Sequence, residues 1–157
     1  MDAVPVINDH VGGVEVTVLD DFSGVDDTLI KGEKILLNGE QALKYVRTRK
    51  DLEDSTNVSR MKRQQQYIES LYNKVKGLMA TNETLVAEAA VKVSEHMVSD
   101  RSVNQLEAIA KKITQYEFAG SINLEGESKV GEKYMEFYPD ENSLKQIVSE
   151  LFCVEKK

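Results

Sequence analysis

Four of the chain's five arginines lie between residues 47 and 63, and this cluster is the part of the sequence best suited to chemistry. Seven cations and three anions give residues 44–63 a formal charge of +4, whereas the whole chain carries −7. Arginine presents a planar set of donors that matches carboxylate and phosphate groups better than lysine does. The sequence therefore predicts an anion site on one basic segment of an otherwise acidic protein.

The spacing of the cluster predicts how its donors converge. Arg47 and Arg49 point to the same side if this segment is extended, because side chains two apart share a face of a strand. Arg60 falls in the first turn of the next predicted helix, Gln64 lies four residues on along the same face, and Arg63 lies beside Gln64. A helix N-terminus itself attracts anions. Among anions, a diphosphate makes the best use of so many donors.

Two other interpretations of the cluster follow from the same residues. The arginines could pair with nearby carboxylates in a solvated network; the candidates are Asp51, Glu53 and Asp54. A nucleic-acid surface would need a broader basic face and stacking aromatic side chains. The chain has no tryptophan, and acidic segments flank the cluster. We therefore expect no nucleic-acid partner.

Hydrophobic periodicity predicts the elements that position these residues. A short helix spans residues 3–10, a strand spans 14–18, and a loop with a short extended run covers 20–37. A helix begins at Asn38, which has capping-box spacing to Gln41. A loop over residues 50–57 precedes a long helix over 58–76.

Five residues predict the buried face of this long helix: Met61, Ile68, Leu71, Tyr72 and Val75. Gly77 suits its C-terminal end.

The remaining sequence predicts two further helices, then two extended runs and a last helix. The helices span 83–98, with Met97 on the apolar face, and the segment after the capping box formed by Ser102 and Gln105. The extended runs span 118–124 and 130–138. The last helix follows Pro139 and Asp140, and its apolar face includes Cys153 as a core residue.

Interleaved helices and strands predict an α/β fold, with a layered α-β-α sandwich around a mixed sheet. The length of 157 residues predicts a single domain over 1–157. Three or four strands are few for this number of helices, which indicates a domain that is incomplete on its N-terminal side. No segment is apolar enough to be a membrane span or a signal peptide, and one cysteine cannot form an intrachain disulfide.

Two sequence blocks resemble the signature of the LytR–CpsA–Psr family. They are LNGEQALKYVRTRK at residues 37–50 and SRMKRQQQYI at residues 59–68. The opening run MDAVPVINDHVGGVEVTV and the closing run YMEFYPDENSLKQIVSELF are similar to neighbouring parts of the family domain. The resemblance covers nearly the whole chain.

The resemblance implies a function in cell-wall assembly. Members of this family are membrane-anchored, extracytoplasmic phosphotransferases, mainly of Gram-positive bacteria. They use magnesium to move a teichoic acid or capsule polymer from an undecaprenyl-pyrophosphate carrier to peptidoglycan. The resemblance implies that Arg47, Arg49, Arg60 and Gln64 hold the lipid pyrophosphate. Arg63 matches a recurring position that we include in the same substrate-binding set.

The sequence also departs from the family pattern. The family domain begins well before Met1, with further strands, metal-binding aspartates and an arginine–aspartate motif that have no match here. We therefore expect a C-terminal portion of the domain, without the N-terminal strands, the anchor, the magnesium ligands or any assignable catalytic residue. Ser59 stands where glycine is common, and Asn57 where aspartate is common. The pairs Asp20-Asp21 and Asp26-Asp27 are expected in solvated turns, since their spacing does not fit a calcium loop.

Three hypotheses about function follow. The chain is part of a glycopolymer ligase and contributes the arginine cluster; or it is a non-catalytic module that binds polyprenyl pyrophosphate and pairs through exposed sheet edges with a partner or a second copy. A transcription regulator is the third, which the acidic charge and the absence of a helix-turn-helix pattern disfavour.

Overall fold

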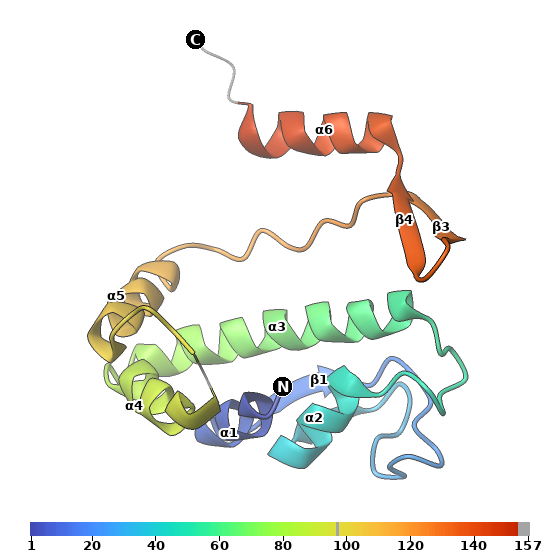
Figure 1. The fold of residues 1–157 in the computed structure, drawn as a ribbon. Coiled ribbons are helices and arrows are strands. Elements are labelled where there is room, and N and C mark those ends of the chain that lie inside the picture. The colour runs from blue at the N-terminus through green and yellow to red at the C-terminus, as the bar shows by residue number, and fades with distance from the viewer. Residues whose placement is uncertain (97, 154–157) are drawn as a thin grey trace. The chain divides into compact units, whose positions relative to one another are not determined.

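The computed structural model describes residues 1–96 and 98–153, and it divides the chain into two units, Met1–Ala119 and Gly120–Lys157 (Figure 1). The single domain predicted over 1–157 stays a prediction. The first unit contains the arginine cluster.

Eight elements make up the first unit in chain order. They are α1 (Ala3–His10), β1 (Val14–Thr17), β2 (Lys34–Leu37), α2 (Gly39–Arg47), α3 (Asn57–Met79), α4 (Leu85–Lys92), the 3₁₀ turn η1 (Ser94–His96) and α5 (Val103–Ile113). Helix α3 packs against both β1 and α2, while α1 contacts α2 and α4, and α4 contacts α5 (Figure 1).

The β1–β2 ladder forms one wall of the core. The strands are antiparallel, with Val14 opposite Leu37 and Val16 opposite Ile35. Val14 and Val16 are buried while Glu15 is exposed, as the period of two in the sequence predicts. The core also includes aromatic side chains from three segments, namely Phe22, Tyr45 and Tyr67.

Helix α2 begins where the sequence predicts, through a complete capping box. The Asn38 side chain accepts from the Gln41 N–H at 2.9 Å, and the Gln41 side chain accepts from the Asn38 N–H at 3.0 Å. The Gly39 N–H donates to Asp9 Oδ1 at 2.6 Å, which ties the start of α2 to α1. The start of α2 is therefore fixed both by its own capping box and by a contact with α1.

The long helix α3 turns only part of its predicted face to the core: Leu71 and Val75 pack against the core as predicted. Thr56 caps it by accepting from the Ser59 N–H at 3.2 Å. Met61 and Ile68 are 36% and 56% exposed, so their predicted burial is wrong. Ser59, Arg63 and Tyr67 are buried instead. The rotation of the helix about its axis is set in part by the buried charge of Arg63, which a search for periodic apolar residues does not include.

The ends of α3 and α4 also differ from the prediction. Gly77 does not end α3, which runs on to Met79. Its φ is not positive, so the position does not need a glycine to stop the helix. Helix α4 is shorter than the predicted 83–98 and gives way to η1; Met97 lies outside the described residues. The capping box of α5 is confirmed, with Ser102 accepting from the Gln105 N–H at 3.4 Å.

The second unit is a hairpin followed by a helix. Strands β3 (Gly126–Val130) and β4 (Met135–Pro139) are antiparallel, and the Gly131 N–H donates to the Tyr134 carbonyl at 2.8 Å in the turn between them. Asp140 caps helix α6 (Glu141–Phe152), as predicted, by accepting from the Ser143 N–H at 2.8 Å. The strand predicted over 118–124 does not form: within the described chain this run has no partner strand. Cys153 is exposed rather than in the core.

The predicted α/β class is confirmed. The described strands pair as two separate antiparallel ladders, where the sequence suggested one mixed sheet, because each strand pairs with its neighbour in the chain. None of the described helices is long and apolar enough to cross a bilayer.

Two glycines give a matched test of this packing. An alanine Cβ at position 39 would lie 2.6 Å from Asp9 Oδ2 and 2.8 Å from the Pro5 carbonyl, whereas at position 77 it would meet no atom within 4 Å. We expect Gly39→Ala to lower the free energy of unfolding by about 1–3 kcal/mol. Gly77→Ala should raise it by about 0.5–1 kcal/mol, because alanine is the better helix former. Urea denaturation measures both; equal stability of the two variants would contradict the packing at α1 and α2.

Candidate anion-binding site

Three segments of the first unit converge on one buried group, the guanidinium of Arg63. Its Nη1 donates to Asp20 Oδ2 at 2.8 Å, just after β1. Its Nη2 donates to the carbonyl of Thr48, just after α2. Arg63 itself is on α3. One side chain therefore joins the three segments that surround the arginine cluster.

Arg63 is fully buried, and its surroundings are aromatic. The side chain is 0% exposed, and its Cζ lies 5.2 Å from the centre of the Phe22 ring and 6.0 Å from that of Tyr45. Burial lowers the pKa of Arg63; the charge of Arg60 acts in the same direction and the charge of Asp20 opposes it. Arginine nevertheless stays protonated. Its Nε has no hydrogen-bond partner among the described residues.

Asp20 and Tyr45 complete the buried group. The Asp20 side chain is 14% exposed and also accepts from the Ser59 hydroxyl. Burial raises the pKa of Tyr45 to about 12, so its hydroxyl stays protonated, and it donates to Gln66 Oε1 at 2.6 Å. The same hydroxyl accepts from the Leu19 N–H at 3.3 Å. The chain is thus held at both Leu19 and Asp20, and Asp20 is not in the solvated turn predicted for it.

Gln64 also contacts the backbone beside the arginines. Its Nε2 donates to the Val46 carbonyl at 3.0 Å. Together with the contact from Arg63 to Thr48, this places α3 side chains on the carbonyls before and after Arg47. An amide nitrogen has two hydrogens, so Gln64 keeps a second one for another acceptor.

Arg47 and Arg49 are the exposed members of the cluster. Neither side chain has a hydrogen bond or ion pair within the part of the chain that the structure describes. Arg47 belongs to the last turn of α2, and the extended backbone begins only at Thr48 (φ −62°, ψ 134°). The predicted extended run from residue 47 is therefore wrong, because the hydrogen bond from the Thr48 N–H to the Lys44 carbonyl keeps Arg47 helical.

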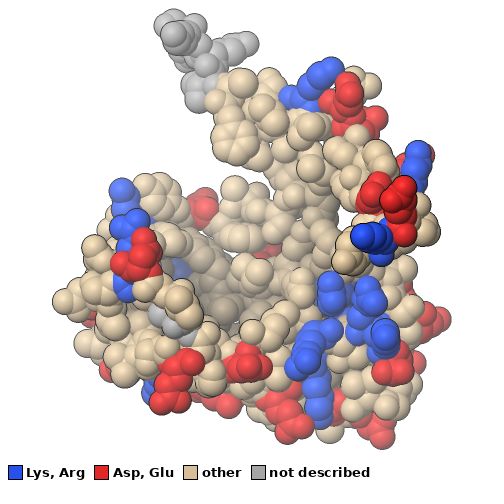
Figure 2. All heavy atoms as spheres, in the orientation of Figure 1, with Lys and Arg blue, Asp and Glu red and all other residues tan. Residues whose placement is uncertain are grey.

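Arg60 is half-buried in the first turn of α3. Its Nη2 donates to Asn57 Oδ1, and its Nε is buried without a partner among the described atoms. The positive charge of Arg60 contributes to lowering the pKa of Arg63. Figure 2 shows lysine and arginine side chains gathered on the surface where α2 ends and α3 begins. A concentrated positive field is suited to an anion.

The predicted salt-bridge network is not formed within the described chain. Glu53 pairs with Lys31 at 3.6 Å, and Asp54 accepts from the Thr56 N–H at 3.0 Å, where the side-chain and backbone hydrogen bonds of Thr56 lower the Asp54 pKa. Neither contacts Arg47, Arg49 or Arg60. The acidic side chains near the cluster in sequence thus leave its exposed cations unpaired.

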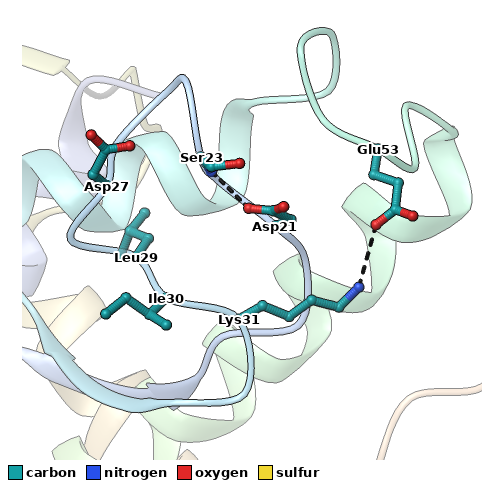
Figure 3. A pocket seen from close by; sticks show the side chains of 7 residues that line it. All are labelled: Asp21, Ser23, Asp27, Leu29, Ile30, Lys31 and Glu53. Carbon is teal, nitrogen blue, oxygen red and sulfur yellow. Dashed lines mark hydrogen bonds and ion pairs between the residues drawn. The ribbon is translucent and has the colours of Figure 1, made fainter.

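A cavity of about 290 Å³ lies in the loop between β1 and β2 (Figure 3). Its lining residues are Asp21, Ser23, Asp27, Leu29, Ile30, Lys31 and Glu53. Asp21 accepts from the Ser23 N–H at 2.8 Å, and this contact lowers the Asp21 pKa. Its carboxylate therefore stabilises the turn to which it belongs. Among the described residues no group of three or more metal-ligating side chains could hold a cation. The magnesium that the family resemblance implies has no fitting ligand set here.

Sequence reasoning missed Asp20, Ser59 and the role of Arg63 inside the fold. One signal could have found them. Arg63 is spaced by four residues from Tyr67, and two more such steps reach Leu71 and Val75, which pack against the core. This spacing places Arg63 on the buried stripe, where a charge needs a partner.

Comparison with known proteins identifies related sequences and folds. The LytR_cpsA_psr family model matches residues 1–152. No curated protein sequence matches the chain.

Three solved structures share the fold. B. subtilis TagV has a TM-score of 0.71 at 26% identity and covers 96% of this chain, with 59% of its own chain covered. B. subtilis TagU has a TM-score of 0.66 at 24% identity over 99% of this chain and 62% of its own. A structure of TagT bound to LIIa-WTA has a TM-score of 0.65 at 22% identity; the match covers 95% of this chain and 56% of the TagT chain. The chain thus spans less than two thirds of each.

The site predicts opposite stability effects for its exposed and buried arginines. We expect Arg47→Ala and Arg49→Ala to change the free energy of unfolding by less than about 0.5 kcal/mol, because neither side chain has a partner in the described part of the chain. Arg63→Ala should lower it by about 3–5 kcal/mol, because it leaves Asp20 with an unpaired charge. Thermal melting of the purified variants measures this difference. Similar melting temperatures for Arg47→Ala and Arg63→Ala would contradict it.

Proposed function

This chain belongs to the LytR-CpsA-Psr family, and we propose from that membership that it takes part in transferring a cell-wall glycopolymer from a polyprenyl-pyrophosphate carrier to peptidoglycan. Its own contribution is to bind the pyrophosphate of the donor. Since the chain spans 59% of TagV, the activity of the whole enzyme and its partners are part of the proposal.

The observation that carries the proposal is the pair of exposed arginines that have no partner among the residues the structure describes. Arg47 and Arg49 flank a residue whose carbonyl is held by α3, so their backbone is fixed while their guanidinium groups are free. Arg60, half-buried in the first turn of α3, adds a third charge. Fixed backbone and free donors are what a preorganised anion site requires, because little ordering is left to binding.

A diphosphate fits these donors better than a single carboxylate. Two linked phosphates offer many acceptor oxygens, and three guanidinium groups together with the second amide hydrogen of Gln64 can each find one. A solved structure of TagT, which shares the fold, is bound to LIIa-WTA, and this supports a glycopolymer as the ligand. We therefore assign Arg47, Arg49, Arg60 and Gln64 to the pyrophosphate.

The proposed reaction is a phosphoryl transfer. A peptidoglycan hydroxyl oxygen forms a bond to the phosphorus nearest the glycan, and the bond from that phosphorus to the lipid phosphate breaks. The arginines stabilise the charge that develops on the leaving lipid phosphate. Magnesium, which the family resemblance implies, would neutralise charge on the same group. The described residues supply no ligand set for it, so no step is assigned to the metal, and no base is assigned to the hydroxyl proton.

A non-catalytic module is the second candidate, and one observation favours it. The described residues present an anion site but no metal-ligating group, so they could bind a pyrophosphate lipid without turning it over. Both candidates predict the same binding. Only the transfer of glycopolymer to peptidoglycan separates them.

Binding of geranylgeranyl diphosphate, followed by calorimetry, tests the site. We expect each of Arg47→Ala, Arg49→Ala and Arg60→Ala to weaken binding by about tenfold or more, because a charge-assisted hydrogen bond contributes about 1.5–3 kcal/mol. Arg101→Ala is the matched control, since Arg101 is an exposed arginine that pairs with Asp100 at 3.5 Å, outside the cluster. Geranylgeranyl monophosphate should bind more weakly than the diphosphate. If Arg101→Ala weakened binding as much as Arg47→Ala does, the binding would depend only on the net charge of the chain, and the proposed site would be wrong.

A further inference from the structure

We propose that Arg63 and Asp20 are positioning residues: a buried ion pair that sets where Arg47 and Arg49 stand, without touching the bound anion. The inference rests on the proposed function, since it concerns the same site. It changes the role expected for Arg63, from a ligand of the pyrophosphate to the part that holds two of the ligands in place.

Burial separates Arg63 from any ligand in solvent. Its side chain is 0% exposed, and Phe22 and Tyr45 contact it with their rings. Both of its terminal nitrogens already donate to protein oxygens, on Asp20 and on Thr48. An anion could reach this group only if α3 moved away from the segments it joins.

The planar shape of the guanidinium explains why an arginine is at this position. Nη1 and Nη2 hold Asp20 and the Thr48 carbonyl at a separation fixed by the group itself, so the end of β1 and the end of α2 are tied to α3 in one geometry. A lysine ammonium is a point charge on a flexible stem and does not enforce this spacing. The bond from Gln64 to the Val46 carbonyl holds the same segment one residue before Arg47.

The negative charge of Asp20 gives a test, because the two possible roles of this residue predict opposite changes in anion affinity when the charge is removed. A carboxylate next to a cluster that binds anions opposes binding through simple electrostatics, so removing its charge should tighten binding. If Asp20 instead holds Arg63 in place, removing its charge releases Arg63, loosens Thr48 and weakens binding. The two effects point in opposite directions.

The experiment compares Asp20→Asn with Asp26→Asn in the chain of residues 1–157. Asp26 is the matched control because it also pairs with a cation, Lys44 at 3.0 Å, but does not contact Arg63 or Thr48. We expect Asp20→Asn to weaken binding of geranylgeranyl diphosphate by about tenfold, while Asp26→Asn leaves it within about twofold. Unchanged or tighter binding by Asp20→Asn would overturn the inference.

A double-mutant cycle distinguishes positioning from direct contact. If Arg63 acts through the segment that carries Arg49, then Arg63→Lys weakens binding in the wild-type chain but much less in a chain that already carries Arg49→Ala. Arg63 as a direct ligand predicts the same loss in both backgrounds, and that outcome would also overturn the inference. Arg63→Lys keeps the charge, so it serves as the deciding variant should Asp20→Asn fail to fold.

Amide hydrogen exchange gives a readout that needs no ligand. Asp20→Asn or Arg63→Lys should speed exchange at residues 47–50 while the β1–β2 ladder stays protected. Slow exchange at residues 47–50 in both variants would contradict positioning. A wild-type chain that binds no diphosphate would instead contradict the proposed function, and the exchange result would still decide the role of Arg63.

Discussion

A buried charge has to be neutralised, and the first unit is arranged around that requirement. A guanidinium with 0% exposure would be strongly destabilising on its own, so Arg63 needs Asp20, and Asp20 in turn needs the hydroxyl of Ser59. These partners come from the segments that follow β1 and α2 and from α3 itself. The positions of these elements relative to one another therefore follow from one set of polar contacts as much as from the apolar core.

The same arrangement separates two kinds of arginine within a short segment. Arg63 contacts protein oxygens and aromatic rings, and it is part of the fold. Arg47 and Arg49 contact neither within the described residues, and the fold loses nothing if they bind something else. This division is what a binding site needs, because a side chain that already stabilises the fold must break those contacts before it can hold a ligand.

Sequence reasoning predicted the local features well. The capping boxes of α2 and α5, the alternation in β1 and the start of α6 depend on residues close together in the chain, and all are confirmed. The errors come from contacts between distant residues. Met61 was assigned to the core by periodicity, but the buried face of α3 is set by Arg63 meeting Asp20 across 43 positions. Arg47 is predicted in an extended run, but it is helical, because no glycine or proline in the sequence marks the residue at which α2 ends.

The separation of these partners along the chain has a consequence for how the site is made and lost. The contacts that Arg63 and Ser59 make with Asp20 span about forty residues, so no fragment that lacks part of residues 20–63 contains both. The arginine segment therefore gains its geometry only when the segments that carry Asp20, Thr48 and Arg63 fold together. By linkage, an anion held there binds the native state alone, so its concentration shifts the folding equilibrium and protects loops far from the headgroup against proteases.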